Sequence, residues 1–178
     1  MEARLSLETL KSIPEDELTE FMWDFYLDNL MATPDFDLPR GFRIAKLTIL
    51  FRSEMDNGGI RQYITNHTCG KVADPTELAK RNSMALATVN ECIESLRLIG
   101  ATESAELLKE VLSLYQKFGW PSGPGPDEEE IDPLEFDAIC ERIDHRWFHP
   151  DGADQSYARD WRCGEQYLRE HLDECVID

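Results

Sequence analysis

The sequence predicts an all-α protein, a single domain over residues 1–178 built as an irregular bundle of about seven or eight helices. Three observations lead to this fold class. Apolar residues recur at helical spacing along most of the chain, convincing period-2 alternation is absent, and several segments begin with a capping residue followed by Pro. With 178 residues and 42% hydrophobic content, the chain is long enough to bury a substantial core.

The first half of the chain predicts three helices. Residues 1–12 are expected to fray, and the first helix follows over 14–32, with Pro at its first position and acids in its first turn. A second helix spans 44–55 and leads into the Asn-Gly-Gly turn at 57–59. A short helix over 60–67 comes next, with an apolar residue or His at each position of one face.

The second half predicts four more elements with clear boundaries. The segment 74–100 begins with Asp-Pro-Thr-Glu, which combines a capping acceptor, Pro inside the helix and Glu three residues after the cap. Another helix spans 102–119, and a Pro/Gly-rich, acidic loop occupies 119–131. The cap pattern returns at the start of 132–147, and a last helix covers 157–172.

The charge is the strongest global signal, because 36 acids against 18 bases give a formal net charge of −18. Residues 1–89 hold 14 acids and 10 bases, a net of −4, whereas residues 90–178 hold 22 acids and 8 bases, a net of −14. Such a field repels nucleic acid and anionic membranes and attracts basic surfaces. We therefore expect no direct binding of nucleic acid or membrane, and a basic protein as partner.

Cysteine usage and hydropathy predict a cytoplasmic protein. The five cysteines are odd in number and form no C-x-x-C pair, so reduced thiols are a simpler interpretation than a disulfide framework. No run approaches the roughly 18 apolar residues of a membrane helix. The N-terminus MEARLSLETL also lacks the continuous apolar stretch of a secretory signal.

The segment around the Asn-Gly-Gly turn carries a family resemblance. An acid precedes the turn, a Gln stands three residues after the second Gly, an aromatic follows it and an Asn lies nearby: Glu54, Asn57, Gly58, Gly59, Gln62, Tyr63 and Asn66. An Ile-Gly-Ala turn at 99–101 and an acidic helix at 134–147 extend the likeness over residues 15–175. The chain thus resembles a bacterial family of uncharacterised helical proteins, whose best-known member is a DNA mimic. The resemblance implies the helical fold, a protein that occupies the DNA-binding face of a partner, and a homodimer.

From its residues alone, the turn has a structural interpretation. Gly58 or Gly59 supplies a backbone angle that other residues resist, and either Asp56 or Asn57 can cap the short helix that follows. The alternative is an anion site at that helix start. No Gly-Lys-Ser/Thr follows the turn, which makes the structural role the favoured one.

The acids after the loop are the predicted partner-binding surface. On the helix that follows the loop, the last three acids are spaced i, i+4, i+7 and should flank the core at the surface. Trp120 and Trp147 are candidate anchors if exposed. The alternative is a solvated face. The full set is Asp127, Glu128, Glu129, Glu130, Asp132, Glu135, Asp137, Glu141 and Asp144.

Metal and catalytic motifs are weak, and we predict no metal, no cofactor and no catalytic residue. Cys140, His145 and His149 have zinc-like spacing, but Cys140 belongs to the apolar stripe and Pro150 disfavours a helical His149. The favoured interpretation is a non-enzymatic acidic protein that mimics DNA towards a basic partner such as a transcriptional regulator. The alternatives are a helical protein whose acidic surface serves solubility, and an enzyme with an unrecognised site.

Overall fold

The computed structural model describes residues 4–34, 37–66, 74–118, 133–149 and 156–177. It confirms the all-α fold class, because these residues form seven α-helices with shorter helical turns between them. Within the same ranges, β pairing is limited to one isolated antiparallel bridge between Leu5 and Ile177.

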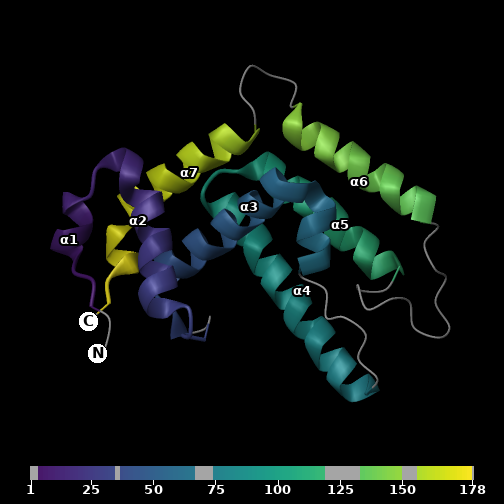
Figure 1. Cartoon of the computed structure of the whole chain (residues 1–178), viewed down its shortest axis with the longest axis horizontal. Helices are drawn as coiled ribbons and strands as arrows, with labels where there is room; N and C mark the ends of the chain where they lie inside the picture. The colour runs from purple at the N-terminus through teal and green to yellow at the C-terminus, as the bar shows by residue number, and fades with distance from the viewer. Residues whose placement is uncertain (1–3, 35–36, 67–73, 119–132, 150–155, 178) are drawn as a thin grey trace.

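The elements follow one another as short helices near the N-terminus and longer ones afterwards (Figure 1). Their bounds are α1 Leu7–Ser12, η1 Glu15–Glu17, α2 Leu18–Phe25, η2 Tyr26–Leu30, α3 Arg40–Asn66, α4 Pro75–Leu98, α5 Thr102–Phe118, α6 Pro133–Phe148, α7 Ser156–Glu170 and η4 Leu172–Cys175.

The N-terminal segment differs from its prediction in two ways. Instead of fraying, residues 7–12 form α1, whose start is capped by Ser6 through its hydroxyl, which accepts from the Thr9 amide, and whose Leu10 is buried. The helix predicted over 14–32 is divided into a 3₁₀ turn, α2 and the π-helix η2. Buried residues here recur every four positions. In an α-helix, four residues turn about 40° more than a full circle, so each buried side chain would point about 40° away from the one before it. The wider π turn counteracts this rotation. The buried residues are Leu18, Met22, Tyr26 and Leu30.

The later helices begin and end close to their predicted positions. The Asp74 side chain caps α4 by accepting from the Thr76 amide at 2.8 Å. The turn after α4 contains Gly100 with a φ of 88°, a left-handed value that favours glycine. The β-prone stretch 48–51 lies inside α3, because its apolar residues belong to a longer helical stripe.

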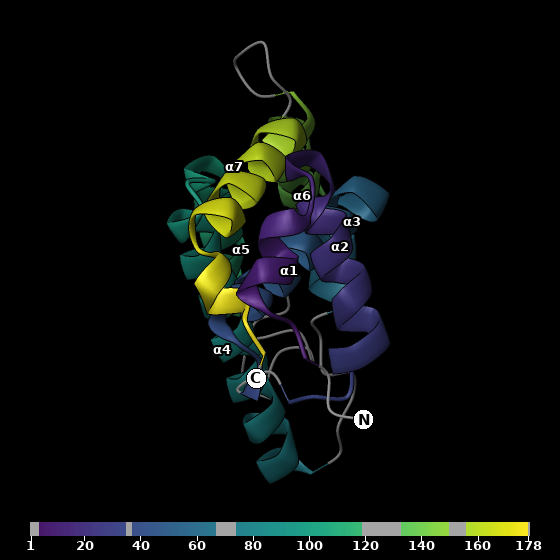
Figure 2. The same ribbon diagram turned by 90° about the vertical axis from the view of Figure 1, so that its left-hand side faces the viewer.

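Two hydrophobic clusters make up the core. The larger joins α4, α5 and α6 to both parts of α3, and includes the fully buried Phe51 and Trp147. The smaller joins α1, α2, the start of α3 and η4, and includes Leu10 and Phe42. Figure 2 shows the end of the molecule that holds the smaller cluster, with α1, α2 and α7 facing the viewer.

The described segments near the two ends of the chain pair with each other. Leu5 and Ile177 each donate a backbone hydrogen bond to the other, both at 3.0 Å. Among the described residues, no helix is long and apolar enough to cross a membrane.

Candidate functional site

The Asn-Gly-Gly turn is a bend inside α3. Gly58 has φ −159° and ψ 15°, and Gly59 has φ 68° and ψ −166°, so the helix stops and restarts there. The Ile60 amide, freed by the bend, donates to Oδ1 of Asp144 in α6 at 2.7 Å. A Cβ on Gly59 would lie 2.3 Å from that carboxylate, so the position needs glycine for both its angle and its space.

The cap of the restarted helix is therefore a distant residue, and the prediction of a local cap is wrong. Asp56 pairs instead with Arg52 at 3.3 Å, one turn earlier in α3. The Asn57 amide lies 3.4 Å from the Ser53 hydroxyl. The Ile60 amide was expected to bond a side chain close to it in sequence, and it bonds the Asp144 carboxylate of α6 instead.

Other members of the motif hold the two parts of α3 together. The Asn66 amide donates to Oε1 of Glu54 at 3.2 Å, which joins residues on opposite sides of the bend. Tyr63 is buried and packs edge-on against Phe51, with ring centroids 5.1 Å apart. The Gln62 side chain lies against Gly58, where a Cβ would meet its Oε1 at 2.3 Å. These contacts give the motif a structural part in the bend.

The three acids of the predicted α6 row lie beside the buried stripe, but they have different surroundings. Asp137 pairs with Arg61 of α3, and Asp144 is half-buried against the bend. Burial raises the pKa of Asp144, while the Ile60 amide and the Arg61 charge act to lower it. Two of the three acids in the row thus attach α6 to α3. Glu141 is exposed, and none of the ion pairs among the described residues includes it.

On the opposite flank of α6, two arginines attach the helix to α5. Arg142 and Arg146 each donate to a carboxylate oxygen of Glu110 in α5, both at 2.6 Å. Burial acts to raise the pKa of Glu110, but the two guanidinium groups outweigh it and hold the pKa below its usual value. Ionic contacts therefore fasten α6 on both sides.

The rest of the predicted acidic surface is only partly visible. Residues 127–130 and Asp132 lie outside the described residues, as does Trp120. Glu135 is exposed. Trp147 is fully buried in the larger cluster, so it cannot serve as a surface anchor.

A second acidic face, on η1, α2 and η2, did not stand out in the sequence. Four exposed acids recur there at positions i, i+3, i+7 and i+11, opposite the buried stripe. Among the described residues, no ion pair joins any of them to a base. Residues 12–39 hold eight acids and no Lys or Arg, and this gap in the bases is the signal that could have revealed the face. The four acids are Glu17, Glu20, Asp24 and Asp28.

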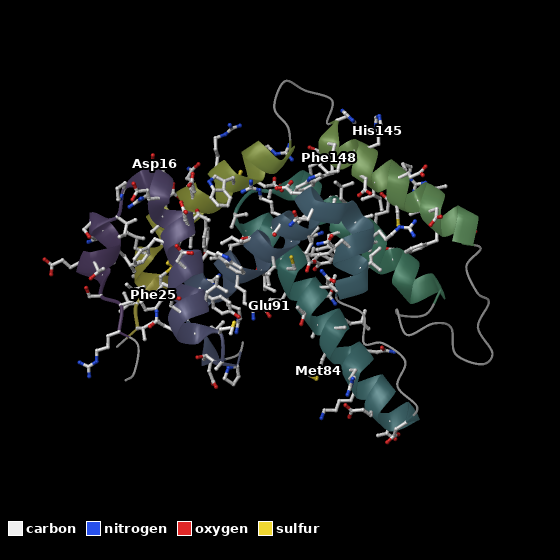
Figure 3. The ribbon with its side chains drawn as sticks, in the orientation of Figure 1. Asp16, Phe25, Met84, Glu91, His145 and Phe148 are labelled. Carbon is white, nitrogen blue, oxygen red and sulfur yellow. The ribbon has the colours of Figure 1, made fainter. Side chains whose placement is uncertain are left out.

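The zinc-like spacing on α6 is split between two environments. The His149 amide donates to the His145 carbonyl at 2.8 Å, so helical spacing persists as far as His149. The ring centroids of the two histidines lie 4.9 Å apart. Figure 3 shows His145 near the C-terminal end of α6, whereas Cys140 is buried. Among the described residues, no group of three or more His, Cys, Asp or Glu is placed to hold a metal.

Among the described residues, one acid belongs to the buried class. Asp160 of α7 is 5% exposed, accepts a short hydrogen bond from the Ser104 hydroxyl and lies 3.7 Å from the Arg159 guanidinium. Burial raises the pKa of Asp160 to about 6. Beside it, the Arg52 guanidinium stacks over the Trp161 ring at 4.2 Å, along the wall of an open hollow of about 300 Å³. These groups lock α7 onto α3 and α5.

Comparison with known proteins places most of the chain in one family. A family model described as DMP19-like protein matches residues 36–171. Searches against curated proteins and against solved structures gave no match. The matched range includes the bend and α6 and begins after the acidic face of α2.

Proposed function

The chain belongs to the DMP19-like protein family, and from that membership and its acidic surface we propose that it acts as a DNA mimic. In this role it occupies the DNA-binding surface of a basic protein, such as a transcriptional regulator, without carrying out catalysis. The mechanism is competition, because lysines and arginines that contact carboxylates are not available to phosphates.

The observation that carries the proposal is the outward acidic face of η1, α2 and η2. Its acids Glu17, Glu20, Asp24 and Asp28 are exposed, and within the described residues no base neutralises them through an ion pair. On α6, by contrast, Asp137 is engaged with an arginine and Asp144 with a backbone amide. A face that keeps its negative charge free is the kind that attracts a basic surface over distance and speeds association.

The charge spacing on this face approximates that of one DNA strand only loosely. Glu20 and Asp24 are four residues apart, which corresponds to about 6 Å along a helix axis. A DNA strand carries one charge per about 3.4 Å of axis. The face thus has roughly half the linear charge density of one strand. Because exposed ion pairs add little energy each, charge alone would give weak, salt-sensitive binding.

The acids that follow Trp120 remain part of the proposal. Glu135 and Glu141 are exposed on α6, and the run from 127 to 132 precedes them in the chain. We propose them as a second acidic segment that extends the attraction. Asp137 and Asp144 are left out of it, because their carboxylates are used inside the molecule.

A capture experiment tests the proposal. The immobilised protein is exposed to host lysate at low and at raised salt, with an unrelated protein of equal net charge as control. Selective capture of a DNA-binding protein that is released by salt and displaced by duplex DNA is the expected result. Capture that matches the control would overturn mimicry and leave the charge of −18 as a solubility feature.

A further inference from the structure

We propose that the outward face of α2 and η2 binds an amphipathic helix of the partner, with apolar side chains on one face and Lys or Arg beside them. The inference rests on the proposed function and names the chemistry of the partner element. Its starting point is an apolar pair next to the acids. Leu27 is 41% exposed and Met31 is 66% exposed, whereas the other large apolar residues of the segment are buried or partly buried.

The π-helix places this pair beside the acidic face. Leu27 and Met31 are four residues apart, so they lie next to each other along η2 and its end. Asp24 and Asp28 have the same spacing and run parallel to them. The result is a line of carboxylates bordered by an apolar line. π-Helical turns are rare, and they occur often at functional positions.

Charge complementarity decides what covers the apolar pair. An anionic lipid surface or an acidic protein would be repelled by the carboxylates beside it. A purely basic surface would leave Leu27 and Met31 in water and gain only weak ion pairs. A partner helix with apolar residues flanked by Lys and Arg can cover the apolar pair and contact the carboxylates at the same time. Helices that bind through apolar anchors use residues at i, i+3 and i+4.

The bases that border the face do not block it. The Lys46 ammonium lies 5.2 Å from the centroid of the Tyr26 ring, on the inner side of η2. Arg169 of α7 donates to the Ile13 carbonyl at 3.0 Å. Both cations thus have contacts elsewhere, and among the described residues no ion pair joins a base to the outward acids. Figure 3 shows the same end of the molecule, with Asp16 and Phe25 labelled.

The face also belongs to a part of the chain that the family model does not reach. The match begins at residue 36, after η2 has ended. The acids, the π turn and the apolar pair therefore lie outside the matched range.

A peptide-binding experiment tests the inference on the full chain. The probe is a fluorescent synthetic helix with Leu along one face and Lys and Arg on either side, and the control peptide carries Ser in place of every Leu. Binding is followed by anisotropy, and the contact surface by amide shifts in NMR spectra. We expect the Leu peptide to bind at least about tenfold more tightly than the Ser peptide. The shifted amides should lie within residues 18–31.

Two double variants with equal charge change locate the site. Asp24→Asn with Asp28→Asn should weaken the Leu peptide about tenfold, because both carboxylates border the apolar pair. Glu135→Gln with Glu141→Gln removes the same charge from the second acidic segment on α6, which lies away from α2 (Figure 1). It should weaken the Leu and Ser peptides by the same small factor, about twofold, and leave the preference for the Leu peptide intact. Leu27→Ser with Met31→Ser should remove the preference for the Leu peptide over the Ser peptide.

Several results would overturn the inference. These are equal affinity for the two peptides, equal losses from the α2 and α6 variants, or amide shifts centred outside residues 18–31. A wild-type dimer in sedimentation that Leu27→Ser with Met31→Ser turns into monomer would make the face a contact between two copies. Failure here is separable from failure of the proposed function. A regulator captured and displaced by DNA, but held equally well by the Asp24→Asn, Asp28→Asn variant, would keep mimicry and reject this face.

Discussion

The acids of α6 and the acids of α2 have similar spacing in the sequence and opposite roles in the structure. On α6, Asp137 pairs with Arg61 and Asp144 accepts from the Ile60 amide, so both fasten the helix to α3. On α2 and η2, Asp24 and Asp28 face solvent without a base in contact. The difference teaches that the density of acids along a chain does not locate its acidic surface. What matters is whether a folded neighbour supplies a base or an amide.

The largest expected effect comes from breaking the bend to which the α6 acids attach. Gly59→Val should lower the free energy of unfolding by about 3 kcal/mol or more, because the residue is left-handed and its side chain would collide with Asp144. Urea denaturation followed by circular dichroism measures the change. Gly164→Ala is the matched control. Its Cβ would be 3.9 Å from Ile99, and it should be neutral or stabilise α7 by up to about 1 kcal/mol.

Removal of the distant cap should have the next largest effect. Asp144→Ala leaves the Ile60 amide without its acceptor and should cost about 1–3 kcal/mol. Asp144→Asn keeps an oxygen at that position and should cost less. Glu141→Ala, an exposed acid one turn earlier on α6, should change the free energy of unfolding by no more than about 0.5 kcal/mol. Equal costs at Asp144 and Glu141 would remove the distinction between attached and outward acids.

A pH series adds the most buried acid to the comparison. The pKa of Asp160 is about 6 in the folded protein and about 3.9 in an unfolded chain, so the folded state favours its protonated form. Its contribution to stability is therefore complete below pH 4 and is lost as the pH rises through about 6. Relative to Asp160→Asn, the wild type should lose about 1–2 kcal/mol between pH 4 and pH 7. A difference that stays constant with pH would contradict this assignment.

The smallest expected effect completes the contrast. Asp24→Asn with Asp28→Asn should shift the free energy of unfolding by less than about 0.5 kcal/mol, since neither carboxylate holds a base. The same double variant is the one expected to weaken binding of the basic peptide. Thermal melts of the Asp24→Asn, Asp28→Asn double variant and of Asp144→Ala, measured side by side, would show this difference in stability. A large loss of stability from the α2 variant would mean that its acids have a structural role after all.

Much of the fold could be predicted because it follows from local rules. The cap at Asp74, the turn at Gly100 and the helical stripes of α4 and α5 depend on residues that are close in sequence. The π turn at 26–30 was missed, since it depends on which residues the smaller cluster buries. The same limit explains α1, whose Leu10 is held by packing against the other end of the chain.

The candidate site was harder to predict for a related reason. Periodicity placed Asp137 and Asp144 beside the buried stripe, and that much is correct. It could not show that α3 would bring Arg61 and a free amide to them, because those partners are more than seventy residues away. The outward acids of α2 and its neighbours are spread along one helix face, so they form no dense run in the sequence. The gap in bases over 12–39 was the more useful pattern.

The sharing of α3 between the two hydrophobic clusters has a consequence for how the molecule responds to a partner. Ala45 packs in the smaller cluster while Ile44 and Leu47, its near neighbours on the helix, pack in the larger. Likewise, α7 supplies Leu168 to one cluster and Tyr167 to the other. Neither cluster can open alone, so the chain should melt in a single cooperative transition. A helix bound on α2 should then slow amide hydrogen exchange along the whole of α3, past the bend.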